Sequence, residues 1–322
     1  MVLIGEWNFM AVLNFCHFDG EFILFPLICC FNKEKQIGMR NIYWLVICLF
    51  IGGGSSAQVP IVGGERVDYY SAWTERTAKV VPMKEIHLSA LAISRYGNYP
   101  KTEINTQALL FPFVPNVGFK HEWFGKNTIV STQHTFYYPS MGLKWMRSSG
   151  FKNQIPKTAS IPQIFVFRNE LIVSRILNPQ PVDCFVRVPD LILTARLGFD
   201  FALTTGKSNF PLLDYYFLYQ RTATYQANRK LYFAGLELDG NVYRNFNFSI
   251  NADYYSIDFN GEWAMESQGK IHWHRNSKFS VSAGYKMYYL DSNYGTQLVA
   301  TPILDFVFKL NHRTKLQSGL FK

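Results

Sequence analysis

The sequence predicts an all-β protein, a transmembrane antiparallel up-and-down β-barrel of about 12 strands. Three observations predict this fold: segments in which apolar and polar residues alternate, charges confined to one of the two alternating rows, and an N-terminal export signal. The composition agrees, because 48% of the 322 residues are hydrophobic and 17% aromatic, whereas only 17% are charged. Soluble domains carry about 25% charged residues. The aromatic content excludes intrinsic disorder, and no run of about 20 apolar residues suggests a helical membrane protein.

The alternation of apolar and polar residues is strict in residues 245–254 and 278–289. In the first of these segments, Phe246, Phe248 and Ile250 alternate with asparagine and serine. Successive side chains of a strand point to opposite faces, so each segment has one apolar and one polar face. The segments run for about ten to thirteen residues, which is longer than an ordinary strand and enough for a tilted strand to cross a bilayer.

The pattern predicts twelve strands that are joined mostly by short turns. They lie near residues 84–96, 101–111, 115–124, 126–138, 161–173, 190–204, 230–243, 245–257, 261–274, 277–289, 296–310 and 313–321. Two connections are long, residues 139–160 and 205–229. With the N-terminus in the periplasm, this count places both on the periplasmic side, whereas such barrels keep short turns there. One further strand before residue 139, for instance at 61–70, would remove the conflict, with 313–321 then a tail.

Charged residues follow the polar row of the alternation, and a charge facing hydrocarbon at mid-depth costs about 2–4 kcal/mol for Lys or Arg. We therefore expect the polar row to line the lumen. The alternative is a soluble sandwich in which the apolar row forms the core, but the strand lengths and the export signal favour the barrel. The expected lumen-lining residues are Glu85, Lys120, Glu122, Arg168, Glu170, Arg196, Asp200, Glu237, Asp239, Asp253, Glu262, Glu266, Lys270 and Lys286.

Residues 39–57 have the pattern of a secretory signal peptide. Arg40 precedes an apolar run at 42–51, and small residues lead up to Ala57. Cleavage after Ala57 starts the mature chain at Gln58. The alternative is a membrane anchor, for which the apolar run is short.

The export signal divides the rest of the chain. Residues 1–38 are interpreted as a mis-assigned N-terminal extension, with Met39 as the true start. Residues 58–83 lack a clear period and are expected to form a periplasmic N-terminal segment, and residues 84–322 are expected to form the outer-membrane β-barrel. Of five cysteines only Cys184 remains after cleavage, so the mature chain has no internal disulfide.

Several short stretches resemble recurrent segments of an uncharacterised group of Gram-negative outer-membrane β-barrel proteins. Aromatic residues near the expected strand ends fit this resemblance, since aromatic girdles flank the walls of such barrels. The resemblance implies an outer-membrane location and contact with the barrel-assembly machinery, without an assigned activity. The chain departs from many barrels in ending on Lys322 after Phe321. The stretches are Ser131–His134 with Tyr137–Pro139, Ile161–Gln163 with Phe167–Glu170, and Thr204–Ser208.

Basic residues crowd the two long connections, where they would suit the phosphates of outer-membrane lipid and lipopolysaccharide. Elsewhere the basic residues are scattered and do not gather on one helix, so nucleic acid is not an expected partner. No cofactor is expected. The basic residues of the connections are Lys144, Arg147, Lys152, Lys157, Lys207, Arg221, Arg229 and Lys230.

A polar, charged lumen favours a porin-like channel or a transport barrel for a small solute, an inference that rests on fold and polarity. One alternative is an outer-membrane lipid-modifying hydrolase with a Ser–His pair. Another alternative is a structural or assembly barrel with a plugged lumen. No catalytic motif is present, so a non-enzymatic role is favoured. The weak catalytic candidates are His134 with Ser131 or Ser140, and His272 or His274 with Ser277.

His272 and His274 share one strand face with Glu262 and Glu266. Histidines two residues apart on a strand can bind a metal. A polar lumen network explains the same residues, and we therefore expect no metal site.

Overall fold

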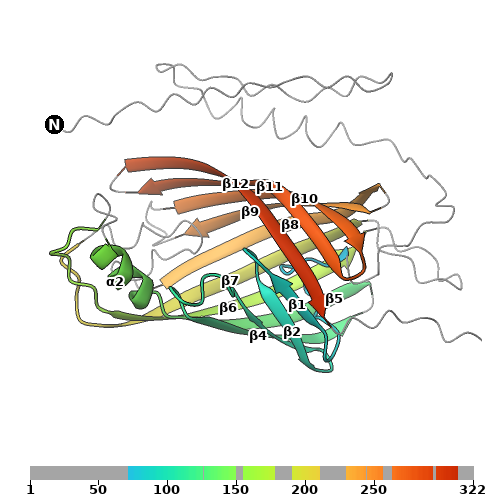
Figure 1. Cartoon of the computed structure of the whole chain (residues 1–322), viewed down its shortest axis with the longest axis horizontal. Helices are drawn as coiled ribbons and strands as arrows, with labels where there is room; N and C mark the ends of the chain where they lie inside the picture. Colours follow the sequence, from blue (N-terminus) through green and yellow to red (C-terminus); the bar gives the residue numbers. More distant parts are fainter. Residues whose placement is uncertain are drawn as a thin grey trace, which may run out of the picture. The chain divides into compact units, whose positions relative to one another are not determined.

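The structure, a computed structural model, describes residues 72–125, 127–149, 155–177, 191–210, 230–243, 245–256, 263–292 and 295–310. Within these ranges, twelve antiparallel strands form one closed barrel (Figure 1). The predicted all-β barrel of 12 strands is confirmed. The strands are β1 Ile86–Ser89, β2 Ser94–Tyr99, β3 Thr102–Thr106, β4 Asn116–Gly125, β5 Thr128–Tyr137, β6 Gln163–Ile176, β7 Leu191–Thr205, β8 Lys230–Tyr243, β9 Phe246–Ser256, β10 Trp263–Asn276, β11 Phe279–Ser292 and β12 Gly295–Leu310.

Each strand pairs with its neighbours in sequence, and β1 pairs with β12 to close the sheet. Ile86 lies opposite Leu310, and Ser89 opposite Val307. Closure by β12 leaves no unpaired edge, which is how barrels avoid pairing with other chains. The expected strand at 313–321 lies outside the described residues.

The prediction of one strand over residues 84–96 is wrong, because this segment forms β1 and β2. The turn between them carries neither glycine nor proline, so the alternation gave no sign of it. Side chains hold it instead: the Ser94 hydroxyl accepts the backbone N–H of Ser89 and donates to the Ser89 carbonyl, and Asp305 of β12 accepts the backbone N–H of Leu91 at 2.8 Å. A distant strand therefore helps to fix this turn.

The additional strand also settles at which end the long connections lie. Connections after odd-numbered strands share one end of an antiparallel barrel, and residues 138–162 and 206–229 follow β5 and β7. We call this the long-loop end. The chain enters β1 at the opposite, N-terminal end, which is the arrangement typical of outer-membrane barrels. The conflict raised by the sequence therefore disappears without a strand at 61–70, a segment outside the described residues.

Helix α2, Ser140–Ser149, lies at the long-loop end of the barrel (Figure 1). Ser140 begins the helix, and its Oγ accepts the backbone N–H of Ile164 at 2.7 Å. Leu143 of the helix is fully buried with Ile155 and Ile164. The helix is thereby fixed to the start of β6. In the described part of the chain, no helix has the length and apolarity needed to cross a membrane.

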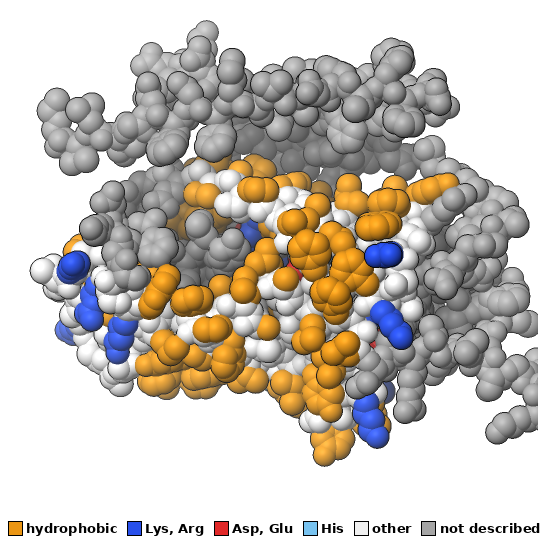
Figure 2. Space-filling view, viewed as in Figure 1, with side chains coloured by type: hydrophobic (Ala, Val, Ile, Leu, Met, Phe, Trp, Pro, Cys, Tyr) orange, Lys and Arg blue, Asp and Glu red, His pale blue; other side chains and the backbone are white. Residues whose placement is uncertain are grey.

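The two faces of the wall have opposite character. The outer face exposes large apolar side chains along the strands, and Figure 2 shows them covering the wall while Lys and Arg lie towards its ends. The charged residues of the strands that do not point inward lie at or next to strand ends; they are Arg175, Lys230, Arg275 and Asp291. The exposed apolar residues include Phe119, Phe167, Leu171, Leu193, Leu197, Phe199, Phe201, Leu236, Ile250, Met265, Ile271, Met287, Leu304 and Phe306.

The pairing of β1 with β12 can be tested by cross-linking. Leu88 and Phe308 are directly opposite, which places their Cα atoms within the range that a disulfide bridges. In a chain whose other cysteines are replaced by serine, the pair Leu88→Cys and Phe308→Cys should oxidise to an intramolecular disulfide, seen as faster migration on a non-reducing gel. The pair Leu88→Cys and Phe306→Cys is diagonal and should react more slowly. Equal reaction of both pairs would contradict the register.

Candidate functional site

The lumen of the barrel is the candidate site, since most of the chain's buried charged side chains face it. The structure places the described members of the expected lumen-lining set inside the wall, buried or nearly so; Glu262 lies outside the described residues. Further inward residues lie outside that set, among them His87 of β1, Arg95 of β2, Glu103 of β3, and Asp305 and Lys309 of β12. His87 shares a 2.7 Å contact with the carboxylate of Glu85. Among the apolar wall residues, Leu231 and Tyr288 face inward at the long-loop end.

Residues 72–81, which we call the lumenal segment, lie inside the barrel and bind several strands at once. Its backbone N–H groups donate to the wall: Ala78 to the Ser174 hydroxyl and Val81 to the Glu103 carboxylate, each at 2.8 Å. Arg95 of β2 donates in return to the carbonyl of Lys79 at 2.5 Å. We expected residues 58–83 to be a periplasmic segment; the described end of that segment occupies the lumen.

Arg76 is the central cation of the lumenal segment. Its Nε lies 3.0 Å from Glu237 of β8, and its Nη2 contacts the carboxylate of Asp253 of β9. Both carboxylates are essentially inaccessible to solvent. A buried carboxylate without a partner is costly, so a guanidinium between the two stabilises both. Burial alone would lower the pKa of Arg76, but Asp253 and Glu237 raise it well above its usual value.

Asp253 also binds Arg196 of β7, although β8 lies between their two strands. At this point β8 has a glycine, Gly235, and so carries no side chain. Arg196 is opposite Gly235 in the sheet, and Gly235 is opposite Asp253. A Cβ on Gly235 would collide with the Asp253 carboxylate. The glycine therefore leaves the space through which the guanidinium and the carboxylate meet.

Glu75 extends the network to the other side of the barrel. Its carboxylate lies 3.1 Å from Lys270 of β10, and its backbone carbonyl accepts from Lys120 of β4 at 3.1 Å. Burial acts to raise the pKa of Glu75, but the ammonium of Lys270 and nearby hydrogen bonds lower it to about 2. The carboxylate is therefore ionised at neutral pH, and the pair links the lumenal segment to the wall as two opposite charges.

Apolar contacts hold the lumenal segment at the N-terminal end of the barrel. Trp73 and Ala78 pack in one buried cluster with Ile129 of β5, Ile172 of β6 and Ile192 of β7. The segment is therefore fixed by apolar packing on one side and by ion pairs on the other.

Charges of the wall that do not reach the lumenal segment are paired across adjacent strands. Arg168 of β6 forms two 2.7 Å hydrogen bonds with Asp200 of β7. Lys286 of β11 lies 2.7 Å from Glu266 of β10. Asp239 of β8 differs, because neither of its buried carboxylate oxygens has a hydrogen-bond partner among the described residues.

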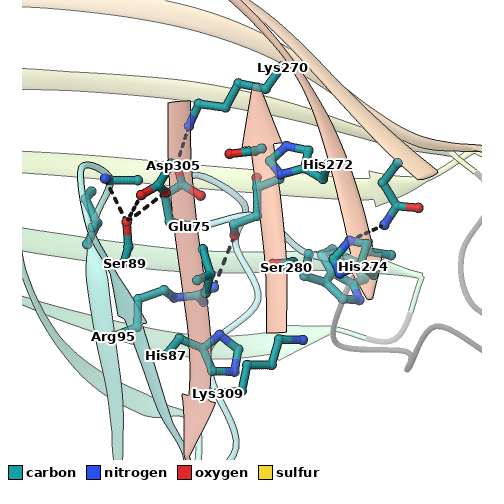
Figure 3. A pocket seen from close by; sticks show the side chains of 18 of the residues that line it. Glu75, His87, Ser89, Arg95, Lys270, His272, His274, Ser280, Asp305 and Lys309 are labelled. Atoms are coloured by element: carbon teal, nitrogen blue, oxygen red, sulfur yellow. Dashed lines mark hydrogen bonds and ion pairs between the residues drawn. The ribbon is translucent and has the colours of Figure 1, made fainter. Parts of the chain in front are cut away.

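A small cavity lies between the lumenal segment and the inner faces of β1 and β9–β12 (Figure 3). Its volume is about 70 Å³, which is room for a few water molecules. Imidazole, ammonium and hydroxyl groups line it, together with two carboxylates. The labelled lining residues are Glu75, His87, Ser89, Arg95, Lys270, His272, His274, Ser280, Asp305 and Lys309.

The candidate Ser–His pairs do not form. Ser131 and His134 are three residues apart on β5, so they face opposite sides of the wall, with Ser131 buried inside and His134 exposed outside. His134 shares a 2.8 Å hydrogen bond with Asn169 of the adjacent strand. Ser140 is occupied as the first residue of α2 and donates to the carbonyl of Pro162. A pairing of His134 with either serine is therefore wrong.

His272 and His274 do face the lumen, but they bond to side chains of β9. His272 shares a 3.0 Å hydrogen bond with Ser249, and His274 a 3.2 Å one with Asn247, while Ser277 lies in the turn after β10. Within the described ranges no group of three or more His, Cys, Asp or Glu side chains is placed to hold a metal ion.

The strongest feature of the site, the lumenal segment, was not found from the sequence. It has no hydrophobic period, and its charges resemble those of a solvated linker. The three charged residues Glu75, Arg76 and Lys79 are the one feature of the segment that could have indicated binding to the wall. Their meaning becomes clear only beside the acidic inner face of β8 and β9. No protein-family model matches the chain, and a search of curated proteins finds no similar sequence.

The double use of Asp253 generates a stability prediction. Replacement of Asp253 by Asn removes the charge between Arg76 and Arg196 and should destabilise the folded barrel by about 3–5 kcal/mol, the usual cost of breaking a buried ion pair. Urea unfolding in detergent micelles, followed by tryptophan fluorescence, measures it. Asp291→Asn, at the end of β11, is the control and should change stability by less than about 0.5 kcal/mol. Equal stability of the two variants would show that the buried pair contributes little.

Proposed function

We propose that the protein is an outer-membrane β-barrel with a pathway for small polar solutes, and that the lumenal segment closes this pathway in the state described. The observation that carries the proposal is the position of residues 72–81 inside a charged lumen, tied to the wall through Arg76 and Glu75. A cavity of about 70 Å³ lies beside the segment at the N-terminal end. In this proposal, solutes pass when the segment moves out of the lumen.

Insertion into a membrane is supported by the outer face of the wall. Soluble monomers rarely expose apolar patches of more than a few hundred Å², whereas apolar side chains cover successive strands here (Figure 2). The strands from β4 onward have 10 to 16 residues, enough to cross the hydrocarbon core at a tilt. The signal-peptide pattern at residues 39–57 supports export to the outer membrane.

Lipid partners are supported by the charge at the long-loop end. Lys144 and Arg147 lie on α2, and Lys157 and Lys207 are exposed in the adjoining connections. Such a basic rim suits the phosphates of lipopolysaccharide and of outer-membrane lipid. Insertion of a closed barrel also implies the barrel-assembly machinery as a partner.

A movable closure is favoured over a permanent plug by the nature of the contacts. The lumenal segment is joined to the wall largely by ion pairs and hydrogen bonds, such as Lys79 with Glu122 at 3.1 Å. Water and dissolved ions can replace contacts of this kind when the segment leaves the lumen. The strand ladder around the segment does not depend on them.

Conductance across planar bilayers tests this proposal. The refolded protein should conduct weakly, whereas Arg76→Gln combined with Lys79→Gln should increase the open fraction by about tenfold or more, because each lost charged hydrogen bond favours release of the segment. Lys144→Gln removes a cation outside the lumen and should leave conductance unchanged.

The conductance experiment also separates the alternative functions. Heat-modifiable migration on gels verifies that the double variant is folded. A folded double variant that stays closed would contradict the channel and support a plugged structural barrel.

The membrane location yields a second prediction. Leu236 is exposed in the middle of β8. Its replacement by arginine should lower the free energy of unfolding in lipid vesicles by about 2–4 kcal/mol. Val242, exposed near the end of the same strand, should tolerate arginine at a cost of about 0–1 kcal/mol. Urea unfolding in lipid vesicles measures both. If Leu236→Arg is as mild as Val242→Arg, this face does not lie in hydrocarbon.

A further inference from the structure

We propose that the cavity at the N-terminal end of the lumen is a binding site for a small oxyanion, with inorganic phosphate as its simplest member. This site is separate from solute passage, because binding needs only the closed state described. It lies inside the barrel, so the ligand is a free ion and not the headgroup of a lipid around the wall.

Buried polar side chains, one of them with an unpartnered ring nitrogen, point to a ligand in this cavity. Ser280 and Ser282 of β11 are more than nine-tenths buried, and their hydroxyl-bearing side chains line the cavity. His274 of β10 is buried to the same degree, and its Nδ1 has no hydrogen-bond partner among the described residues, while its other ring nitrogen is bonded to Asn247. Buried polar atoms are normally satisfied by protein, water or ligand.

The carboxylates that line the cavity are already engaged. Glu75 is paired with Lys270 at 3.1 Å (Figure 3). Asp305 accepts the hydroxyl of Ser89 with both oxygens, at 2.8 and 2.9 Å. The free hydrogen-bonding capacity of the cavity is therefore mostly that of donors. An anion with several acceptor oxygens matches it better than a cation.

The formal charge of the lining also favours an anion. Arg95, Lys270 and Lys309 bring three cations to the cavity, against the two carboxylates; Arg95 also pairs with Glu103, and Lys270 with Glu75. Charge-assisted hydrogen bonds to an oxyanion are about twice as strong as neutral ones. The volume of about 70 Å³ accepts a tetrahedral ion of five non-hydrogen atoms.

The ligand would contact both parts of the molecule. Thr74 and Glu75 of the lumenal segment form one side of the cavity, and β11 and β12 form the other. The donors named above all lie on the wall, and the segment closes the cavity on its other side.

Calorimetric titration of the refolded full chain in detergent micelles tests the site, with inorganic phosphate added at constant ionic strength. We expect saturable binding of one phosphate and no saturable heat from sodium chloride. Ser280→Ala combined with Ser282→Ala should weaken phosphate binding about tenfold or more, because two donors to a charged ligand are lost. Ser131→Ala removes another buried inward hydroxyl outside the cavity and should bind phosphate as the unaltered chain does.

A second variant keeps the test decisive if the double serine variant does not fold. Lys309→Gln removes one cation from the lining and should also weaken phosphate binding about tenfold. Absence of saturable phosphate binding by the unaltered chain would overturn the proposal, as would unchanged affinity in the folded variants. Calorimetry measures phosphate binding and does not require an open pore. The result therefore does not depend on whether the channel proposal is correct.

Discussion

Neutralising the charges inside a closed β-wall is the constraint on which the rest of the structure depends. Each isolated charge taken out of water costs several kcal/mol unless a counter-ion meets it. The wall pairs some charges itself, as Arg168 does with Asp200. Glu237 and Asp253 are instead bound by Arg76 of the lumenal segment. The segment is therefore part of the electrostatics of the barrel and not a passive filling, and its position follows from the carboxylates on β8 and β9.

The strands were predictable where the wall is long and regular. The alternation of apolar and polar residues predicted strands at 190–204 and 296–310, and the structure has them at Leu191–Thr205 and Gly295–Leu310. The prediction worked there because the lumen and the outer face require opposite polarity of successive residues. The same rule failed at 84–96. There the alternation continues through a turn held by Asp305, which is distant in sequence. A turn fixed by a non-local contact leaves no local signal.

In the lumen, too, the sequence pattern predicted some features and not others. The odd or even position of a residue along its strand was enough to predict which charged residues point inward. It could not indicate their partners, which depend on strand register: Arg196 binds Asp253 of β9 across Gly235, and not Asp200 of its own strand. The lumenal segment was missed for another reason. An extended chain that satisfies its backbone on the side chains of many strands has no period of its own, so its contacts become visible only in three dimensions.

The contacts that close the lumen differ in kind from those that close the wall. The strands are joined by continuous backbone ladders, whose separation would leave a row of unpaired backbone groups on each of two strand edges. The lumenal segment is joined by side-chain pairs that face a polar interior, where water can take the place of either partner. Its apolar anchor, Trp73 against Ile172 and Ile192, lies at the N-terminal end alone. The contacts between the segment and the wall are therefore a few ion pairs, side-chain to backbone hydrogen bonds and one small apolar cluster, and the strand ladders themselves run outside them.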